Sequence, residues 1–316
     1  LGDVYKRQDL AKALGVPELK LVIIGPCTTP QQQQDLFSVL DHHLQDKDEV
    51  VLDITHGYRH LPFLLSYMLM AIHWTKEVTV KAVYYGALEM TDSESGETPV
   101  LDLSLCVQYA KTTSSLASFI FTGNYRPFAD IPAFRRSSRF LAEGSFLENI
   151  NRLAEGRTPA QSALDQLESA ESEPEISADP LNRHIREVLL EALGWAREPE
   201  LTKRYLAKAE LFIRHAEYFK AIVCLFEAIQ RWAMDCSAKD GQPIGWTEPD
   251  QKERPKVIAQ AVGRYGGDEL KRRFVILRHL RNVIVHGLKP KCSGRRALND
   301  VQACLKAEED MKRFLN

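Results

Sequence analysis

The chain lacks the sequence features that mark membrane-spanning, disulfide-stapled and zinc-binding proteins. No apolar run among its 316 residues is long enough to cross a bilayer. It has six cysteines but no Cys-x-x-Cys pair, so neither a zinc site nor a disulfide framework is indicated. No secretory signal peptide is visible. We therefore expect a cytoplasmic protein with reduced thiols, no metal ion and no cofactor.

The sequence also lacks an initiator methionine. Its first eight residues, 1–8, match the translation of a transposase adaptor used in sequencing libraries. We interpret them as an adaptor-derived scar, exclude them from fold reasoning, and expect native sequence to begin near Asp9.

Charge is distributed unevenly along the chain, although the net charge is only −2. From Leu201 onward there are 23 Lys and Arg against 14 Asp and Glu, a balance of +9, and the rest of the chain carries −11. The segment 271–298 holds nine basic residues and no acidic one. Such clustering is typical of a nucleic-acid partner, whereas an ordinary solvated helix face mixes the two signs.

The first part of the chain alternates between strand and helix patterns. Strands are predicted over 19–24, 49–54 and 78–85, and helices over 34–44 and 61–74. This alternation indicates an α/β domain with a Rossmann-like parallel sheet. A polar loop over 91–99 then leads to a short strand over 100–103, and helices are predicted over 105–121 and 138–155.

The second part reads as all helical. The segment 165–179 carries six acids, no bases and one proline, which favours a mobile linker. Helices are predicted over 269–286 and 301–315, with a loop over 241–255. Between the linker and this loop an apolar stripe at helical spacing predicts a core-facing helix; its members are Phe219, Ile222, Phe226, Ile229 and Ala233.

A polar turn follows the 49–54 strand, in the run Asp53-Ile-Thr-His-Gly57. Open α/β sheets bind ligands at the carboxyl ends of their strands, and helix N-termini favour phosphates. The residues predicted to bind a ligand there are Thr55, His56, Gly57, Arg59 and His60, with Tyr85 and Gly86 at the end of the next strand. Alternatively, Gly57 serves only a tight turn and Asp53 only caps the following helix.

The wider run, 52–62, resembles the signature of the CRISPR-associated DxTHG-motif family. The match covers Asp53, Thr55, His56 and Gly57. The resemblance implies a CARF sensor domain that binds a cyclic oligoadenylate, most often cyclic tetra-adenylate. It also implies a homodimer, with the symmetric ligand lying across its axis.

The penultimate helix ends in Arg281-Asn-Val-Ile-Val-His286, which resembles the signature of HEPN ribonucleases. Asn282 and His286 are four residues apart and share one helix face, while Arg281 is expected to lie to the side. In that family two copies build one composite site. The implied catalytic residues are Arg281, Asn282 and His286, and those predicted to carry the RNA backbone are Lys271, Arg272, Arg278, Lys289 and Lys291.

These residue types suit RNA cleavage without a metal ion. Histidine can exchange protons near neutral pH, and an arginine fork can stabilise charge on phosphate oxygens. A lone histidine at a helix C-terminus is otherwise usually a cap favoured by the helix dipole. Together the two resemblances imply a cytoplasmic endoribonuclease of type III CRISPR antiviral defence that cuts single-stranded RNA.

The expected domains are an adaptor scar (1–8), a sensor whose first strand is missing (9–135), a helical connector with an acidic linker (136–180) and a HEPN-like nuclease (181–316). Two rival interpretations stay open. One is a non-enzymatic sensor of cyclic oligoadenylate, a regulator or adaptor that uses 136–200 to bind DNA. The other is a HEPN toxin with an unrelated nucleotide-binding domain.

Overall fold

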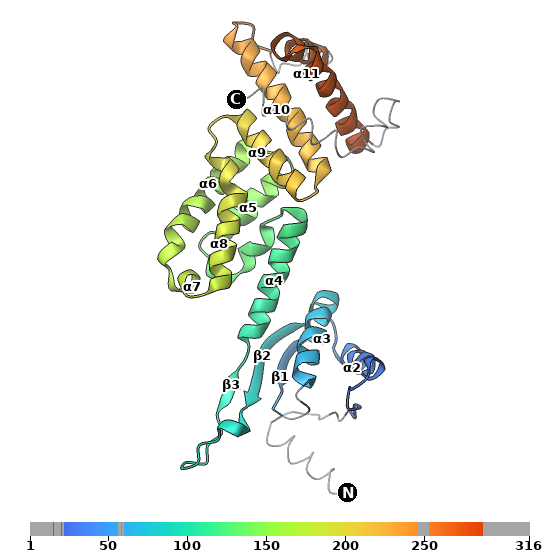
Figure 1. Ribbon diagram of the computed structural model, residues 1–316, viewed down its shortest axis with the longest axis vertical. Helices are drawn as coiled ribbons and strands as arrows, with labels where there is room; N and C mark the ends of the chain where they lie inside the picture. The colour runs from blue at the N-terminus through green and yellow to red at the C-terminus, as the bar shows by residue number, and fades with distance from the viewer. Residues whose placement is uncertain are drawn as a thin grey trace. The chain divides into compact units, whose positions relative to one another are not determined.

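The chain forms two compact units, which divide after Lys111 (Figure 1). The computed structural model describes Gly15, Lys20, 22–55, Tyr58, 60–244 and 253–286, except for the side chains of 172 and 284–286. The boundary expected at 135/136 therefore falls inside the second unit. No helix within these ranges is long and apolar enough to span a membrane.

The first unit contains a three-stranded sheet in the order β1-β2-β3. Strands β1 (Glu49–Asp53) and β2 (Thr79–Gly86) are parallel and joined by α3 (Leu61–Lys76), which confirms the predicted strand–helix–strand alternation. Strand β3 (Val100–Asp102) runs antiparallel to β2, so the sheet is mixed and the expectation of a parallel sheet holds only in part. The β2–β3 connection, 87–99, holds a single 3-10 turn (Leu88–Met90) and no α-helix, so the chain returns antiparallel instead of crossing over.

The strand predicted over 19–24 is wrong at the positions that the structure describes, Lys20 and 22–24. Residues 22–28 are irregular, and Ile23 is 89% exposed. Within the described ranges β1 is an edge strand, and the apolar segment 22–24 forms no strand hydrogen bonds with it. Helix α2 (Pro30–His43) begins four residues before the predicted 34, because Thr29 caps it by accepting a hydrogen bond from Gln32 N and Pro30 fits its first turn.

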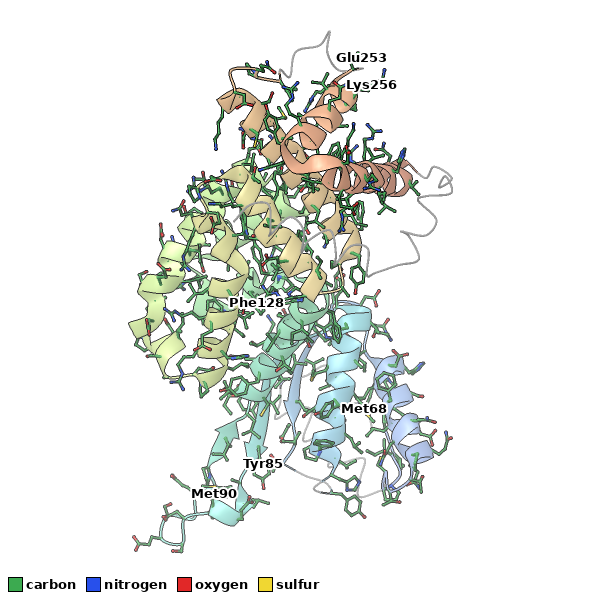
Figure 2. All side chains as sticks on the ribbon, turned by 45° about the horizontal axis from the view of Figure 1, so that its top comes forward. Met68, Tyr85, Met90, Phe128, Glu253 and Lys256 are labelled. Atoms are coloured by element: carbon green, nitrogen blue, oxygen red, sulfur yellow. The ribbon has the colours of Figure 1, made fainter. Side chains whose placement is uncertain are left out.

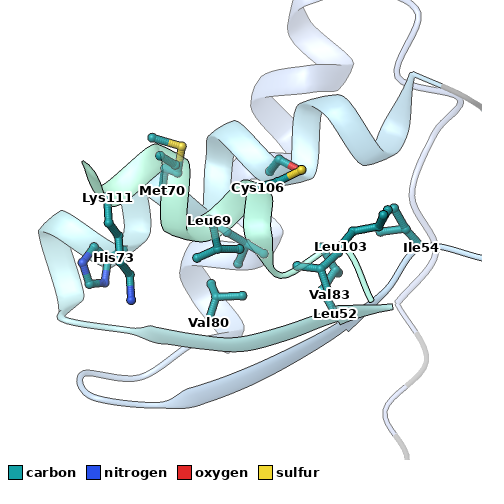
Figure 3. A pocket seen from close by; sticks show the side chains of 13 residues that line it. Leu52, Ile54, Leu69, Met70, His73, Val80, Val83, Leu103, Cys106 and Lys111 are labelled. Carbon is teal, nitrogen blue, oxygen red and sulfur yellow. The ribbon is translucent and has the colours of Figure 1, made fainter. Parts of the chain in front are cut away.

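Helix α3 and helix α4 (Leu105–Thr122) meet over one face of the sheet, around an apolar cavity of about 90 Å³ (Figure 3). Leu52 and Val83 come from the strands, and Leu69 comes from α3. His73 closes one end, where its Nδ1 lies 2.6 Å from the Val78 carbonyl oxygen. This packing fixes the start of α3 relative to the ends of β1 and β2.

The second unit is helical and has two clusters of buried apolar side chains. Phe128, fully buried, lies in the first cluster (Figure 2). The α-helices that follow α4 are α5 (Ser138–Asn149), α6 (Leu153–Ser169), α7 (Pro174–Ser177), α8 (Pro180–Leu193), α9 (Leu201–Arg214), α10 (Tyr218–Lys239) and α11 (Arg254–His286). An α/β unit followed by a helical unit agrees with the predicted order of fold classes, whereas the identities CARF and HEPN stay predictions.

Two predictions in this unit are wrong. The helix predicted over 138–155 breaks between α5 and α6, where Asn151 takes a positive φ of 58°. The acidic segment 165–179 is not a mobile linker, because Leu167 and Ile176 are each only 1% exposed in the first cluster. Its acids face outward and several find partners; for example, Glu171 lies 3.3 Å from Arg186.

The apolar stripe on α10 is largely confirmed. Ile222, Phe226, Ile229 and Ala233 are buried, but Phe219 is 45% exposed and does not belong to the core. Helix α11 contains non-helical backbone at Gly267, with φ 79° and ψ 175°, so the helix predicted to start at 269 is a distinct segment after this break. The helix predicted over 301–315 lies outside the described residues.

Candidate functional site

Thr55 and Gly86 join the carboxyl ends of the two parallel strands. The Thr55 hydroxyl accepts a hydrogen bond of 2.7 Å from Gly86 N, and Thr55 N donates one of 2.8 Å to the Asp53 carboxylate. A Cβ on residue 86 would lie 3.0 Å from the Thr55 methyl group, which is tighter than an ordinary contact. The close approach of these two strand ends therefore depends on a glycine at position 86.

His60 connects this edge to a loop that the sequence interpretation passed over. It occupies the N-cap position of α3, and its Nε2 lies 2.9 Å from the carbonyl oxygen of Pro26. Its ring stacks on Tyr58 at 5.7 Å. The loop 25–29, which carries Thr28 and Thr29, thus borders the same strand ends. The two threonine hydroxyls that follow Gly25-Pro26 in the sequence could have identified this loop as part of the site.

The remaining ligand-binding predictions have different outcomes. Tyr85 lies near the end of β2 (Figure 2), and its hydroxyl donates to the Glu89 carboxylate at 2.7 Å, so this phenol already has a partner within the unit. His56, Gly57 and Arg59 lie outside the described residues, and their roles stay predictions. The structure thus joins Thr55 to Gly86 at the strand ends, and it joins His60, at the start of α3, to the loop 25–29.

The helical unit places Arg278, Arg281 and Asn282 around one hollow of about 300 Å³. Arg281 was expected to lie to the side of the Asn282 stripe. Arg278 stands three residues before Arg281 and four before Asn282, so it neighbours both, and all three side chains line the hollow. The opposite wall comes from α10 and the start of α11; its members include Phe226, Glu227, Gln230, Arg254 and Ile258.

Arg281 is held by its neighbours but keeps hydrogen-bonding capacity. Its Nη1 donates to Asn282 Oδ1 at 3.2 Å, and its guanidinium carbon lies 5.7 Å from the centre of the Phe226 ring. Its Nε is buried and has no hydrogen-bond partner within the described part of the chain. A buried N–H without a partner is costly, so an anionic oxygen that enters the hollow would gain a charge-assisted hydrogen bond.

Glu227 and Arg254 belong to this hollow, and the sequence interpretation missed both. Burial raises the pKa of Glu227, while the charges of Arg281 and Arg254 oppose that rise. Burial also lowers the pKa of Arg254. Glu227 is the one carboxylate in the otherwise apolar run 221–229, which was an available signal. Arg254 gave no such signal, because only the packing of α11 brings it near.

The raised pKa of Glu227 predicts a pH-dependent contribution to stability. The folded state holds this proton more tightly than the unfolded state, so the contribution is fully present below the unfolded pKa, about 4.3. It is lost as pH rises through the folded pKa. Glu227→Gln removes the titration, so its melting temperature relative to the unmodified protein should be higher at pH 7.5 than at pH 4.5. Thermal unfolding by circular dichroism at both pH values measures this difference, and an equal difference at both would contradict the prediction.

The predicted RNA-backbone residues are not equivalent. Arg272 lies 3.2 Å from Glu269, which also pairs with Arg273, so an acid just before the basic segment partly neutralises it. Lys271 extends its aliphatic chain over Gly263. His286 is the last residue of α11, and the structure describes its backbone but not its side chain. Lys289 and Lys291 lie outside the described residues. Among the described side chains, no group of three or more metal-ligating residues could hold an ion.

Comparison with known proteins gives one informative similarity. No protein-family model matches the chain. A stretch of 123 residues, 39% of the chain, is 37% identical to the CRISPR-associated protein MJ1674 of Methanocaldococcus jannaschii. This stretch spans 19% of the length of that relative. The similarity supports a relationship with CRISPR-associated proteins.

Proposed function

We propose that this protein takes part in CRISPR defence as an endoribonuclease that a cyclic oligoadenylate activates and that cuts single-stranded RNA without a metal ion. The observation that carries the proposal is the hollow in which Arg278, Arg281 and Asn282 converge. The CRISPR-associated relative supports the biological setting. The presence of an α/β unit and a separate basic helical unit supports the assignment of activator binding to the first and RNA cleavage to the second.

In the proposed reaction the ribose 2′-oxygen forms a bond to phosphorus while the bond to the 5′-oxygen breaks. His286 takes the proton from the 2′-hydroxyl and, once protonated, gives it to the leaving 5′-oxygen. Arg281 stabilises the charge that develops on the phosphate oxygens through its guanidinium donors. Asn282 holds the guanidinium by its 3.2 Å hydrogen bond. A second copy of the chain completes the site in a homodimer.

The activator is proposed to bind at the strand-end edge of the first unit. Thr55, Gly86 and His60 line it, and His56, Gly57, Arg59 and Tyr85 are assigned to it by the family resemblance. Backbone amides at helix N-termini and the imidazole of His60 are suitable partners for phosphates. Cyclic tetra-adenylate is the proposed ring size.

The proposal is tested by incubating the full-length protein with labelled single-stranded RNA, with and without each cyclic oligoadenylate and with EDTA. Cleavage that requires one activator and survives EDTA is the expected result. Activator binding without any cleavage would favour a non-enzymatic regulator or adaptor instead. Cleavage that is indifferent to every activator would remove the sensor assignment and leave the nuclease.

Gly86→Ala is expected to raise the activator concentration needed for half-maximal cleavage. The added Cβ would crowd the Thr55 side chain at 3.0 Å and disturb the edge. The maximal rate should change little, because the substitution lies in the other unit from Arg281. Gly194→Ala is the control, since a Cβ there meets no atom within 4 Å. Superimposable activation curves for both variants and the unmodified protein would remove position 86 from the site.

A further inference from the structure

A second hollow, of about 320 Å³, lies next to the first one and shares Arg281 with it. Both hollows are bordered by α10: Phe219, Lys220, Val223 and Cys224 line the second one, and Phe226, Glu227 and Gln230 line the first. Its volume lies at the lower end of the roughly 300–1,000 Å³ of small-molecule sites. A ligand group in the second hollow would therefore lie directly beside the group that Arg281 binds in the first.

The second hollow offers an aromatic face. Phe219 is 45% exposed, although it stands on the apolar stripe of α10 whose other members are buried. Phe212 lies deeper in the same hollow and is 4% exposed. Exposed aromatic rings beside cationic groups are the usual stacking platforms for unpaired bases.

Two amides at the end of α5 supply hydrogen-bonding groups. Asn151 accepts a bond of 3.7 Å from the Cys224 thiol through Oδ1, and it lines the hollow. Burial raises the pKa of Cys224 to about 12, so this thiol stays protonated and fixes the orientation of the amide. Asn149 lines the hollow as well, and its Nδ2 lies 3.5 Å from the Ser145 hydroxyl.

The charges in the hollow suit a nucleotide. Lys220 and Arg281 both line it, and Lys220 lies 3.4 Å from Glu217 and 5.4 Å from the Phe212 ring centre. Glu148 also lines the hollow, and its carboxylate is paired with Lys208, which is fully buried and not available to a ligand. A flat apolar face, amide groups and a shared guanidinium are the three elements with which proteins recognise a base and its phosphate.

We propose that this second hollow is a nucleobase subsite, which holds the base of the nucleotide next to the phosphate bound at Arg281. The inference rests on the proposed function in that it takes RNA as the substrate, and it adds that cleavage depends on the base at one position. Phe219 stacks on that base, and Asn149 and Asn151 contact its hydrogen-bonding edge.

The experiment measures binding of fluorescently labelled oligo(rA), oligo(rU) and oligo(rC) to full-length protein carrying His286→Ala, so that the RNA stays intact. We expect affinities that differ between the oligonucleotides by roughly fivefold, as the gain or loss of one hydrogen bond at the base edge allows. Phe219→Leu and Asn151→Gly should each reduce that difference. Glycine accepts the positive φ of residue 151, and leucine keeps an apolar side chain at 219, so both variants preserve the local fold.

Phe146→Leu is the matched control, because Phe146 is 62% exposed on α5 and does not line the hollow. Equal affinity for all oligonucleotides, a difference that both variants retain, or no RNA binding would overturn the subsite. Base-dependent binding without cleavage by the unmodified protein would uphold the subsite and refute the nuclease. Cleavage at every position without base preference would refute the subsite and uphold the nuclease.

Discussion

His286→Ala is expected to slow activated RNA cleavage by roughly 10²–10⁴-fold, the usual contribution of a general acid or base. In the proposed mechanism this imidazole transfers the protons, because histidine is the residue type whose ordinary pKa lies near neutral pH. The substitution should leave thermal stability and activator binding nearly unchanged, because the last residue of a helix contributes little to either. Cleavage rates on labelled RNA under activator saturation provide the measurement.

His279→Ala is the matched control for this prediction, since His279 lies on the same helix and does not line the Arg281 hollow. Arg281→Lys extends the test. It keeps the positive charge but loses the planar fork and the buried Nε donor, so it should also cleave much more slowly than the unmodified protein. Cleavage by His286→Ala at the unmodified rate would refute the assignment of the catalytic site.

Lys208→Met should destabilise the helical unit by about 3–5 kcal/mol, because it leaves Glu148 as a buried carboxylate without its cationic partner. Lys208 is fully buried and Glu148 is 7% exposed, and the two side chains form an ion pair. Glu148 also accepts hydrogen bonds from the Tyr125 hydroxyl at 2.6 Å and from Trp195 Nε1 at 2.9 Å. One carboxylate therefore links α5, α9 and the segments that carry these two aromatic residues.

Urea unfolding measures this loss of stability, and two further variants serve as comparisons. Lys203→Met is the surface control, because Lys203 is 43% exposed in its 3.4 Å pair with Glu200, and it should change stability by no more than about 0.5 kcal/mol. The double variant Glu148→Gln, Lys208→Met should be more stable than Lys208→Met alone, since it removes both charges and keeps an acceptor for Tyr125 and Trp195. A Lys208→Met variant as stable as Lys203→Met would contradict the argument.

The sequence predicted those parts of the fold that local periodicity determines. The β1–α3–β2 unit, the stripe on α10 and the helix after Gly267 all follow from spacing within one segment. The antiparallel β3 depends on loop geometry, and the packing of 165–179 depends on Ile176 finding a distant core. Composition alone made that acidic segment resemble a linker, although its few apolar residues were enough to anchor it.

The candidate site likewise contains residues that helical spacing predicts and residues that only long-range packing brings together. The convergence of Arg278, Arg281 and Asn282 follows from helical spacing, and the sequence supplied all three residues. Glu227 and Arg254 join them only through the packing of α10 against α11, a long-range contact that no motif encodes. Phe219 was predicted to be buried, and its exposure is what makes the second hollow suitable for a base.

The break at Gly267 decides how far apart the arginines of α11 lie. An uninterrupted α-helix rises 1.5 Å per residue, so residues 254 and 281 would be about 40 Å apart along its axis. In the structure both line one hollow, because the chain reverses course between them. The neighbouring Gly266 also admits no side chain, since a Cβ there would lie 2.4 Å from Leu270 Cδ2. Two adjacent glycines thereby bring Arg254 and Arg281 to one concave hollow, so the local concentration of positive charge depends on the backbone at 266–267 as much as on the arginines themselves.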